Sequence, residues 1–376
     1  MSSSKRVGHV NVPGKILLLG GYTVLEPGNP ALSLAVLDSR GRGVTASVER
    51  SASDMLVSEE FGIKKEIRSP EVVRENVAAS AFYTAKTYLE SKGLTGHWEV
   101  RVHNSPMFGR RFKSGLGSSA ASTVAVVKSL FRASRLDLRS NGETMHKLSQ
   151  YAYAAYAGKA ESGFDIATCA YGGSIVYTRY LPGSIELPGS LVATEFLERL
   201  LQSLTGTWRG LRVKSARVPA KFSVLFFNIE GARTSTTGNV GAVMGWRATH
   251  ARKYTSLIEA QKLHELAGIE SFQRGEGEEL RARVRMAREI QRKLQVLVAA
   301  ERADFDLIEP PVLTKLIEFG ESLPGVVVGR CPGAGGWDGL VFVTDEGELK
   351  EGTPSKIVTA AKGRGLTLTR VRLRLA

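Results

Sequence analysis

The sequence predicts a mixed α/β protein with two domains, and three observations lead to this prediction. The chain of 376 residues is long enough for two domains and a sizeable core. Before about residue 220, stretches with strand-like alternation come between stretches with helical spacing, and a helical block with three strands follows. Three glycine-rich segments lie near the start, in the middle and near the end of the chain.

The composition is that of an ordinary globular protein, with 43% hydrophobic and 23% charged residues. No apolar run is long enough to span a membrane, and the first residues lack the apolar segment of a signal peptide. The two cysteines, Cys169 and Cys331, have neither metal-ligand spacing nor the pattern of a disulfide framework. We therefore expect a cytoplasmic location, with import into an organelle left open.

The net charge of +14 favours anionic partners, which could be nucleic acid or small polyanions. Within 281–293 most arginines fall on the outer face of an expected helix, whose buried face carries Val284, Ala287 and Ile290. No aromatic residues alternate with these arginines, which argues against binding of single-stranded nucleic acid. The composition thus leaves nucleic acid and small polyanions open.

The pattern of the first 220 residues predicts strands and helices that alternate. A buried strand broken by a glycine turn is expected within 9–25, and a helix is expected to open at Ser69-Pro70 and to end at Gly93. A second helix covers Glu143–Ala157. Half-buried strands are expected at 44–48, 98–102 and Ser174–Tyr180.

In the rest of the chain the pattern predicts a helical block at 240–319 and a helix at 355–362. Strands are expected at Phe222–Phe227, Gly325–Gly329 and Leu340–Val343. In the last strand the apolar positions change from even to odd numbers after Leu368, so we expect a β-bulge near Arg370.

The central glycine segment, Lys113-Ser-Gly-Leu-Gly-Ser-Ser-Ala-Ala121, has the properties of a phosphate-binding loop. Gly115 and Gly117 lack side chains that would keep an anion away from the backbone. A helix is expected to start at Ser118, where free N–H groups and the positive end of the helix dipole favour an anion. The alternative is a tight loop with a capping serine. The surrounding sequence fits neither a dinucleotide-binding turn nor a Walker loop.

Two further residues are candidates for chemistry. Lys15 directly precedes the apolar run 16–19, which would hold its ammonium group at a fixed point, although a lysine at a strand end is more often a surface residue. Asp165 follows the small-residue turn Gly158–Gly163, where capping of a helix is the alternative role.

Three segments in this order resemble the motifs of the GHMP small-molecule kinases. They are Pro13-Gly-Lys-Ile-Leu-Leu-Leu-Gly-Gly-Tyr-Thr-Val-Leu25, Lys113–Ala121 and Pro332-Gly-Ala-Gly-Gly-Trp-Asp-Gly339. Within that superfamily the sequence is most similar to the eukaryotic-type phosphomevalonate kinases. Gly158-Lys159, Ser162–Asp165 and the loop 231–237 also follow that pattern, and the resemblance spans residues 10–345.

The resemblance implies the GHMP kinase fold with ATP in the cleft between two domains. Residues 1–218 would form an N-terminal ATP-binding domain of the ribosomal-S5-domain-2-like type. Residues 219–376 would form a C-terminal ferredoxin-like domain. The activity implied is transfer of the ATP γ-phosphoryl group to (R)-5-phosphomevalonate, with Mg²⁺ as cofactor, in the mevalonate pathway to isoprenoids. The resemblance thus implies small-molecule substrates and no nucleic acid, membrane or obligate protein partner.

The resemblance also implies roles for individual residues. Lys15 and Asp165 would be catalytic, with Asp165 fixing Lys15 and accepting any remaining proton. The ATP-binding residues would be Lys113, Gly115, Leu116, Gly117, Ser118, Ser119 and Ala120, with Ser118 or Ser119 as a Mg²⁺ ligand. The acceptor would be bound by Lys15, Lys159, Ser162, Gly163, Arg233, Gly333, Ala334, Gly335 and Gly336.

Three positions depart from the family pattern and concern the acceptor more than the nucleotide. Glu161 stands where the family usually has glycine, Gly28-Asn29 shortens a polar stretch, and Trp337 replaces glycine or tyrosine. A kinase acting on mevalonate or homoserine is the nearest alternative. A catalytically silent protein that binds nucleic acid is a second alternative, and the presence of all the motif residues argues against it.

Overall fold

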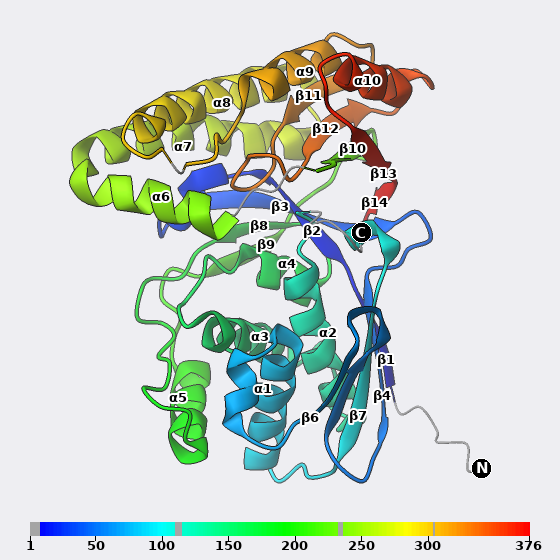
Figure 1. Cartoon of the computed structure of the whole chain (residues 1–376), viewed down its shortest axis with the longest axis vertical. Coiled ribbons are helices and arrows are strands. Elements are labelled where there is room, and N and C mark those ends of the chain that lie inside the picture. Colours follow the sequence, from blue (N-terminus) through cyan, green and yellow to red (C-terminus); the bar gives the residue numbers. More distant parts are fainter. Residues whose placement is uncertain (1–7, 110–114, 232–235, 304) are drawn as a thin grey trace.

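The computed structural model describes residues 8–109, 115–231, 236–303 and 305–376, and it confirms the mixed α/β class. The described strands form three sheets. In the orientation of Figure 1, one sheet and its helices form the lower half, the second sheet crosses the middle, and the third lies at the top beneath long helices. No helix in the described ranges is both long and apolar enough to cross a membrane.

The first sheet and the helices packed on it belong to the largest hydrophobic core, which also includes residues of the other two sheets. In β4 and β7 every second residue is buried, as the sequence predicts, and α2 packs against this face. The strand order is β1-β4-β7-β5-β6. The strands are β1 (Gly8–Val12), β4 (Val44–Arg50), β5 (Met55–Ser58), β6 (Ile63–Glu66) and β7 (Trp98–Asn104).

The helices of this half mostly agree with the sequence pattern. The helix expected from Ser69 to Gly93 is wrong in its first part, because the structure has a 3₁₀ turn there and α1 begins only after Asn76. The Asn76 side chain accepts hydrogen bonds from the N–H groups of Ala78 and Ala79, which makes it the N-cap. The helices are η3 (Pro70–Arg74), α1 (Val77–Ser91), α2 (Ser118–Ala133), α3 (Gly142–Ala157), α4 (Phe164–Tyr171) and α5 (Ala193–Thr205).

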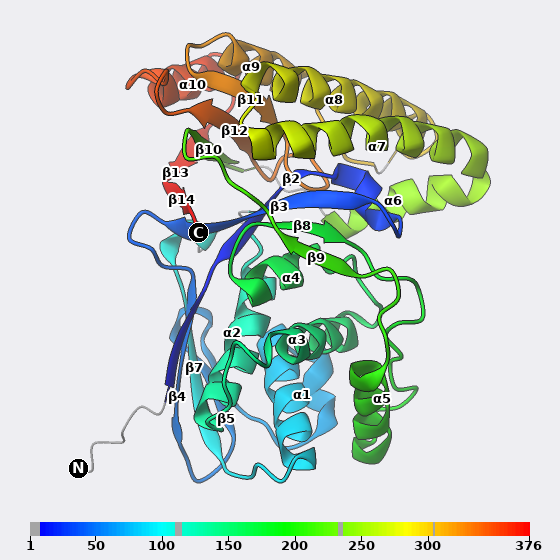
Figure 2. The ribbon, with the colours of Figure 1, turned by 180° about the vertical axis from the view of Figure 1, so that it is seen from behind.

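The second sheet lies between the two halves in both views (Figures 1 and 2). Its longest strand is β3, which pairs with β2 and β8 and is buried along most of its length. The 3₁₀ helix η1 (Gly21–Leu25) lies in the connection between β2 and β3. The strands are β2 (Gly14–Leu19), β3 (Pro30–Asp38), β8 (Ile175–Thr178), β9 (Arg212–Ser215) and β14 (Leu373–Leu375).

The third sheet is antiparallel, in the order β11-β12-β10-β13, and long helices cover it. Helices α7 and α8 pack side by side across the top of the molecule (Figures 1 and 2). The strands are β10 (Phe222–Ile229), β11 (Val326–Arg330), β12 (Leu340–Asp345) and β13 (Leu368–Val371). The helices are α6 (Thr236–Thr249), α7 (Ala251–Arg274), α8 (Gly277–Ala299), α9 (Pro311–Glu321) and α10 (Thr353–Lys362).

The arginines of α8 differ in one respect from the outer-face pattern expected. Arg288 is buried and forms ion pairs with Glu309 and Glu321. These carboxylates compensate its charge, which allows the guanidinium to be buried.

The expected bulge near Arg370 is wrong. The chain end is instead two short strands that belong to different sheets: β13 pairs with β10, and β14 pairs with β3. The shift of apolar parity therefore marks the point at which the chain passes from one sheet to the other. The domain boundary between residues 218 and 219 stays a prediction, and β14 adds the last residues of the chain to the second sheet.

A buried network joins the two halves at the glycine turn after β2. Glu265 of α7 accepts a hydrogen bond from the Gly20 N–H at 2.8 Å, and Arg330 of β11 lies 3.3 Å from the same carboxylate oxygen. Arg330 also donates to the Gln291 side chain of α8 at 3.2 Å. The Glu265 and Arg330 side chains are 1% and 2% exposed, so each charge depends on the other for compensation.

We predict that Glu265→Gln lowers the free energy of unfolding by about 3–5 kcal/mol, because it leaves the buried Arg330 charge without its partner. Urea unfolding of the purified protein measures this change. The matched control is Glu259→Gln on the same helix. The Glu259 side chain is 57% exposed in its pair with Lys262, so this variant should stay within about 0.5 kcal/mol of wild type. Equal effects of the two substitutions would contradict the prediction.

Candidate active site

Lys15 of β2 joins the first motif to the second. Its backbone N–H donates to the Leu116 carbonyl at 2.8 Å, and its ammonium Nζ donates to the Gly115 carbonyl at 2.9 Å. The same Nζ lies 5.3 Å from the centre of the Phe164 ring, at the start of α4. The lysine is therefore anchored at both its backbone and its charge, and it is not a free strand-end residue.

The glycines of the second motif are needed for the approach of Lys15 as well as for access of an anion. Gly117 has a φ of +79°, and a Cβ atom on it would lie 3.0 Å from two methylene carbons of Lys15. On the other side, a Cβ atom on Gly14 would lie 2.7 Å from the Leu116 carbonyl oxygen. A side chain at Gly14 or Gly117 would push the two motifs apart.

The second motif leads into the N-terminus of α2, as the sequence predicts. The helix begins at Ser118, and no side chain in the described structure caps it at Gly117. Its first turn has no acidic residue, so the positive end of the dipole is not neutralised there. Ser118 is half-buried, Ser119 is exposed, and Leu116 and Ala120 pack into the core.

Asp165 lies in the first turn of α4, on the other side of Lys15. Its Oδ1 accepts a hydrogen bond from the Ile166 N–H, and the helix is capped by Gly163, which is buried closely against Tyr177 and Gln150. Among the residues that the structure describes, no direct ion pair joins Asp165 to Lys15. The ammonium group is held instead by the Gly115 carbonyl.

Asp165 acts on Lys15 through its field. Burial lowers the pKa of the Lys15 ammonium, and the largest opposing effect is the negative charge of Asp165. Asp338 and Cys169 oppose the effect of burial as well. The expected role of Asp165 in fixing Lys15 stays a prediction.

The third motif lies alongside β2. The Gly333 N–H donates to the Leu17 carbonyl at 3.3 Å, and the Tyr22 hydroxyl donates to the Ala334 carbonyl at 3.1 Å. Gly336 donates to the Ile308 carbonyl at 2.7 Å, and a Cβ atom on Gly335 would collide with the same carbonyl. All three motifs therefore meet around β2.

The other expected acceptor residues lie less centrally. Lys159 is exposed and pairs with Glu161 at 3.4 Å, so the departure from the family pattern at Glu161 supplies the partner of this lysine. Ser162 is half-buried, and its carbonyl accepts a hydrogen bond from the Tyr177 hydroxyl. Lys113 and Arg233 lie outside the described residues.

Sequence reasoning missed two charged residues, Asp338 near Lys15 and Lys128 near Cys169. Asp338 comes close to the second motif, because its Cβ lies 3.6 Å from the position of a Cβ on Gly115. It is the one charged residue within the third motif, which could have drawn attention to it. Lys128 of α2 donates to the Cys169 carbonyl at 3.4 Å, and burial lowers the pKa of its ammonium.

The two cysteines are buried, and burial raises the pKa of both thiols. The Cys169 thiol donates to the Pro13 carbonyl at 3.2 Å, next to the first motif. Both are structural residues in this fold, because a buried thiol with a raised pKa forms little thiolate.

Comparison with known proteins agrees with this geometry. Residues 77–173 match the GHMP kinases N terminal domain. The chain is 30% identical to a phosphomevalonate kinase of Gibberella zeae, over 64% of this chain and 54% of that protein. It is 24% identical to a phosphomevalonate kinase of Candida albicans, over 90% of each.

A solved structure has the same fold. Phosphomevalonate kinase of Streptococcus pneumoniae, in complex with phosphomevalonate and AMPPNP, superposes with a TM-score of 0.72 at 19% identity, covering 97% of this chain and 100% of that one. Together with the sequence matches, this confirms the GHMP kinase fold and the resemblance to phosphomevalonate kinases. The chain is thus similar to the GHMP kinases in its fold and, over residues 77–173, in its sequence.

Proposed function

We propose that the protein is a phosphomevalonate kinase, which transfers the γ-phosphoryl group of ATP to (R)-5-phosphomevalonate and releases ADP and 5-diphosphomevalonate. The observation that carries the proposal is the Lys15 ammonium group, held on the Gly115 carbonyl beside the N-terminus of α2. Similarity to curated phosphomevalonate kinases supports the choice of acceptor, although the chain spans only 54% and 58% of the first two relatives.

In this proposal the main task of the site is to bring two polyanions together. The acceptor phosphate has a second pKa of about 6 and is largely ionised at neutral pH, so little proton removal is needed. Fixed positive charge and positioning then provide most of the catalysis. Lys15 faces the phosphates of both substrates, and Asp165 maintains the positive charge of Lys15 and accepts any remaining proton.

The ATP phosphates would lie at the start of α2, bound by the backbone of Gly115–Ala120 and by Lys113. Mg²⁺ prefers oxygen ligands and usually takes only one or two from the protein, leaving the others to phosphates and water. The hydroxyls of Ser118 and Ser119, at the uncapped helix start, fit such a donor set. When bound, the ion would neutralise charge on the transferring phosphoryl group.

The acceptor would lie on the side of the third motif. Gly333–Gly336 shape that wall, and Lys159, Ser162, Gly163 and Arg233 are the proposed contacts. In the described structure Lys159 is engaged by Glu161, so binding the acceptor would require exchange of this exposed ion pair for the acceptor phosphate. Such a pair costs little to break, which keeps Lys159 available.

The proposed function also includes a division into two domains, a choice of acceptor and a location in the cell. We assign residues 1–218 to the ATP-binding domain and 219–376 to the C-terminal domain. Mevalonate and homoserine kinases would share the ATP site, so the acceptor distinguishes them from the proposed activity. A cytoplasmic location is proposed for this chain, whereas a relative from Arabidopsis thaliana carries the name phosphomevalonate kinase, peroxisomal.

We predict that purified protein with Mg-ATP releases ADP with phosphomevalonate and scarcely with mevalonate or homoserine. A charged acceptor gains from the cations of the site, whereas an alcohol needs a base that takes its proton. Coupled measurement of ADP release with each acceptor gives kcat/KM. Comparable kcat/KM for phosphomevalonate and mevalonate would exclude the proposed specificity.

Lys15→Met should lower kcat by about 10²-fold or more, because the ammonium group is most needed when negative charge is shared in the transition state. Steady-state kinetics with both substrates varied measure the effect. Lys293→Met on the outer surface of α8 removes a lysine whose side chain is 62% exposed and serves as the control. If the Lys15→Met enzyme has a kcat near that of the control, Lys15 has only a structural role.

Asp165→Asn should move the alkaline limb of the pH–kcat profile to lower pH. The carboxylate opposes the effect of burial, so its loss lowers the pKa of Lys15 further and the ammonium group deprotonates earlier. The acidic limb, set by the acceptor phosphate, should remain. Profiles of wild type and mutant between about pH 5 and 10 test both limbs, and loss of the acidic limb alone would identify Asp165 as the general base.

A further inference from the structure

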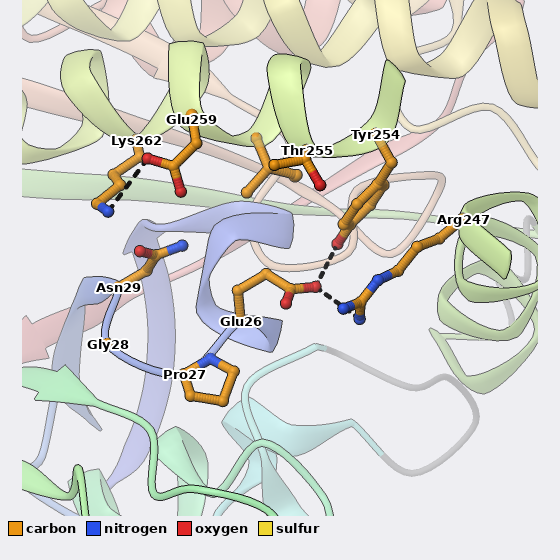
Figure 3. A pocket seen from close by; sticks show the side chains of 10 residues that line it. Glu26, Pro27, Gly28, Asn29, Arg247, Tyr254, Thr255, Glu259 and Lys262 are labelled. Atoms are coloured by element: carbon orange, nitrogen blue, oxygen red, sulfur yellow. Dashed lines mark hydrogen bonds and ion pairs between the residues drawn. The ribbon is translucent and has the colours of Figure 1, made fainter. Parts of the chain in front are cut away.

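A pocket of about 230 Å³ lies behind the first motif, between residues 26–29 and helix α7 (Figure 3). Its lining combines two carboxylates, Glu26 and Glu259, with two cations, Arg247 and Lys262. These charges pair within the pocket, so it is not a ready binding site for an anion. The two pairs differ in what they connect.

Glu26 connects three elements, whereas Glu259 binds within one helix. The Glu26 Oε1 atom accepts a hydrogen bond from the Tyr254 hydroxyl of α7 at 3.0 Å and pairs with the Arg247 guanidinium of α6 at 2.8 Å (Figure 3). The Arg247 guanidinium also lies over the Tyr254 ring, 5.2 Å from its centre. Glu259 pairs with Lys262, three residues away on α7.

The contacts of Glu26 lie at the edge of a small hydrophobic cluster that supports the third motif. Val243 and Trp246 of α6, Tyr254 of α7 and Tyr22 of the first motif are buried together there, and Ala334 packs against them. The Tyr22 hydroxyl holds the Ala334 carbonyl. A shift of α6 would therefore reach the third motif through Tyr22 and Ala334.

We propose that Glu26 is a positioning residue, which fixes α6 and α7 against the first motif and thereby sets the acceptor side of the cleft. The inference rests on the proposed function for the identity of the acceptor. Glu26 touches neither Lys15 nor the second motif among the described contacts, so it should act on the acceptor and leave the nucleotide site unchanged.

The exposure of the Glu26–Arg247 pair to water distinguishes a positioning role from a role in global stability. The side chains of Arg247 and Glu26 are 45% and 18% exposed. Pairs with such access to water contribute little to global stability. Loss of the carboxylate should therefore change the local position of α6 with little change in the unfolding midpoint.

The first test is steady-state kinetics of Glu26→Gln with phosphomevalonate and ATP. KM for phosphomevalonate should rise about three- to ten-fold, while KM for ATP stays within about two-fold of wild type. Glu259→Gln is the matched control in the same pocket and should change neither value. Equal changes of both KM values, or the same change in the control, would overturn the proposal.

The second test is a charge exchange. Arg247→Glu alone should raise KM for phosphomevalonate as Glu26→Gln does, and the double variant Glu26→Arg/Arg247→Glu should restore at least part of the loss, because the pair is re-formed with opposite polarity. A double variant at least as impaired as the worse single variant would mean that the pair does not position α6.

Amide hydrogen exchange of the free protein distinguishes failure of this inference from failure of the proposed function. Residues 238–247 of α6 should exchange several-fold faster in Glu26→Gln than in wild type or Glu259→Gln, with no substrate present. If wild type does not use phosphomevalonate, the proposed function fails while this comparison still tests Glu26. Unchanged exchange in Glu26→Gln would overturn the positioning role.

Discussion

The Glu265 carboxylate determines how the two halves of this protein meet. It binds the Gly20 N–H within the first motif and the Arg330 guanidinium of β11, which lies two residues before the third motif. The first motif and the strand before the third motif therefore bind the same buried carboxylate. A buried ion pair of this kind adds little net stability compared with apolar packing, but it has few alternative arrangements because an unpaired charge is costly there. The glycine turn after β2 and the end of β11 are thus bound to the same carboxylate.

The site built on this frame relies on close contact between backbone segments. Gly14 and Gly117 allow β2 and the second motif to approach, and the approach places the Lys15 ammonium group on the Gly115 carbonyl. Burial then works against the charge of Lys15, and the carboxylate of Asp165 offsets part of that effect. The same glycines that would admit phosphate therefore also place the lysine that would meet it.

Polar contacts of the third motif extend this arrangement toward α6 and α7. The Tyr22 hydroxyl binds the Ala334 carbonyl, and the cluster around Tyr22 ends at the Glu26 carboxylate with its contacts to α6 and α7. In the proposed function, side chains that do not contact a substrate would in this way influence the position of the third motif. Such control would suit the proposed reaction, in which two anions must be aligned.

The sequence by itself determined the α/β class, most helices and strands, the start of α2 at Ser118 and the three motifs, because periodicity and glycine placement are local properties. It predicted neither the N-cap at Asn76 nor the passage of the chain end from one sheet to another at β13 and β14. Only the tertiary structure decided that Lys15 binds the Gly115 carbonyl, that Glu265 joins Gly20 to Arg330, and that Asp338 approaches Gly115. These contacts join residues separated by 65 to 245 positions, and the pairing of such distant polar groups depends on how the chain packs rather than on any local pattern.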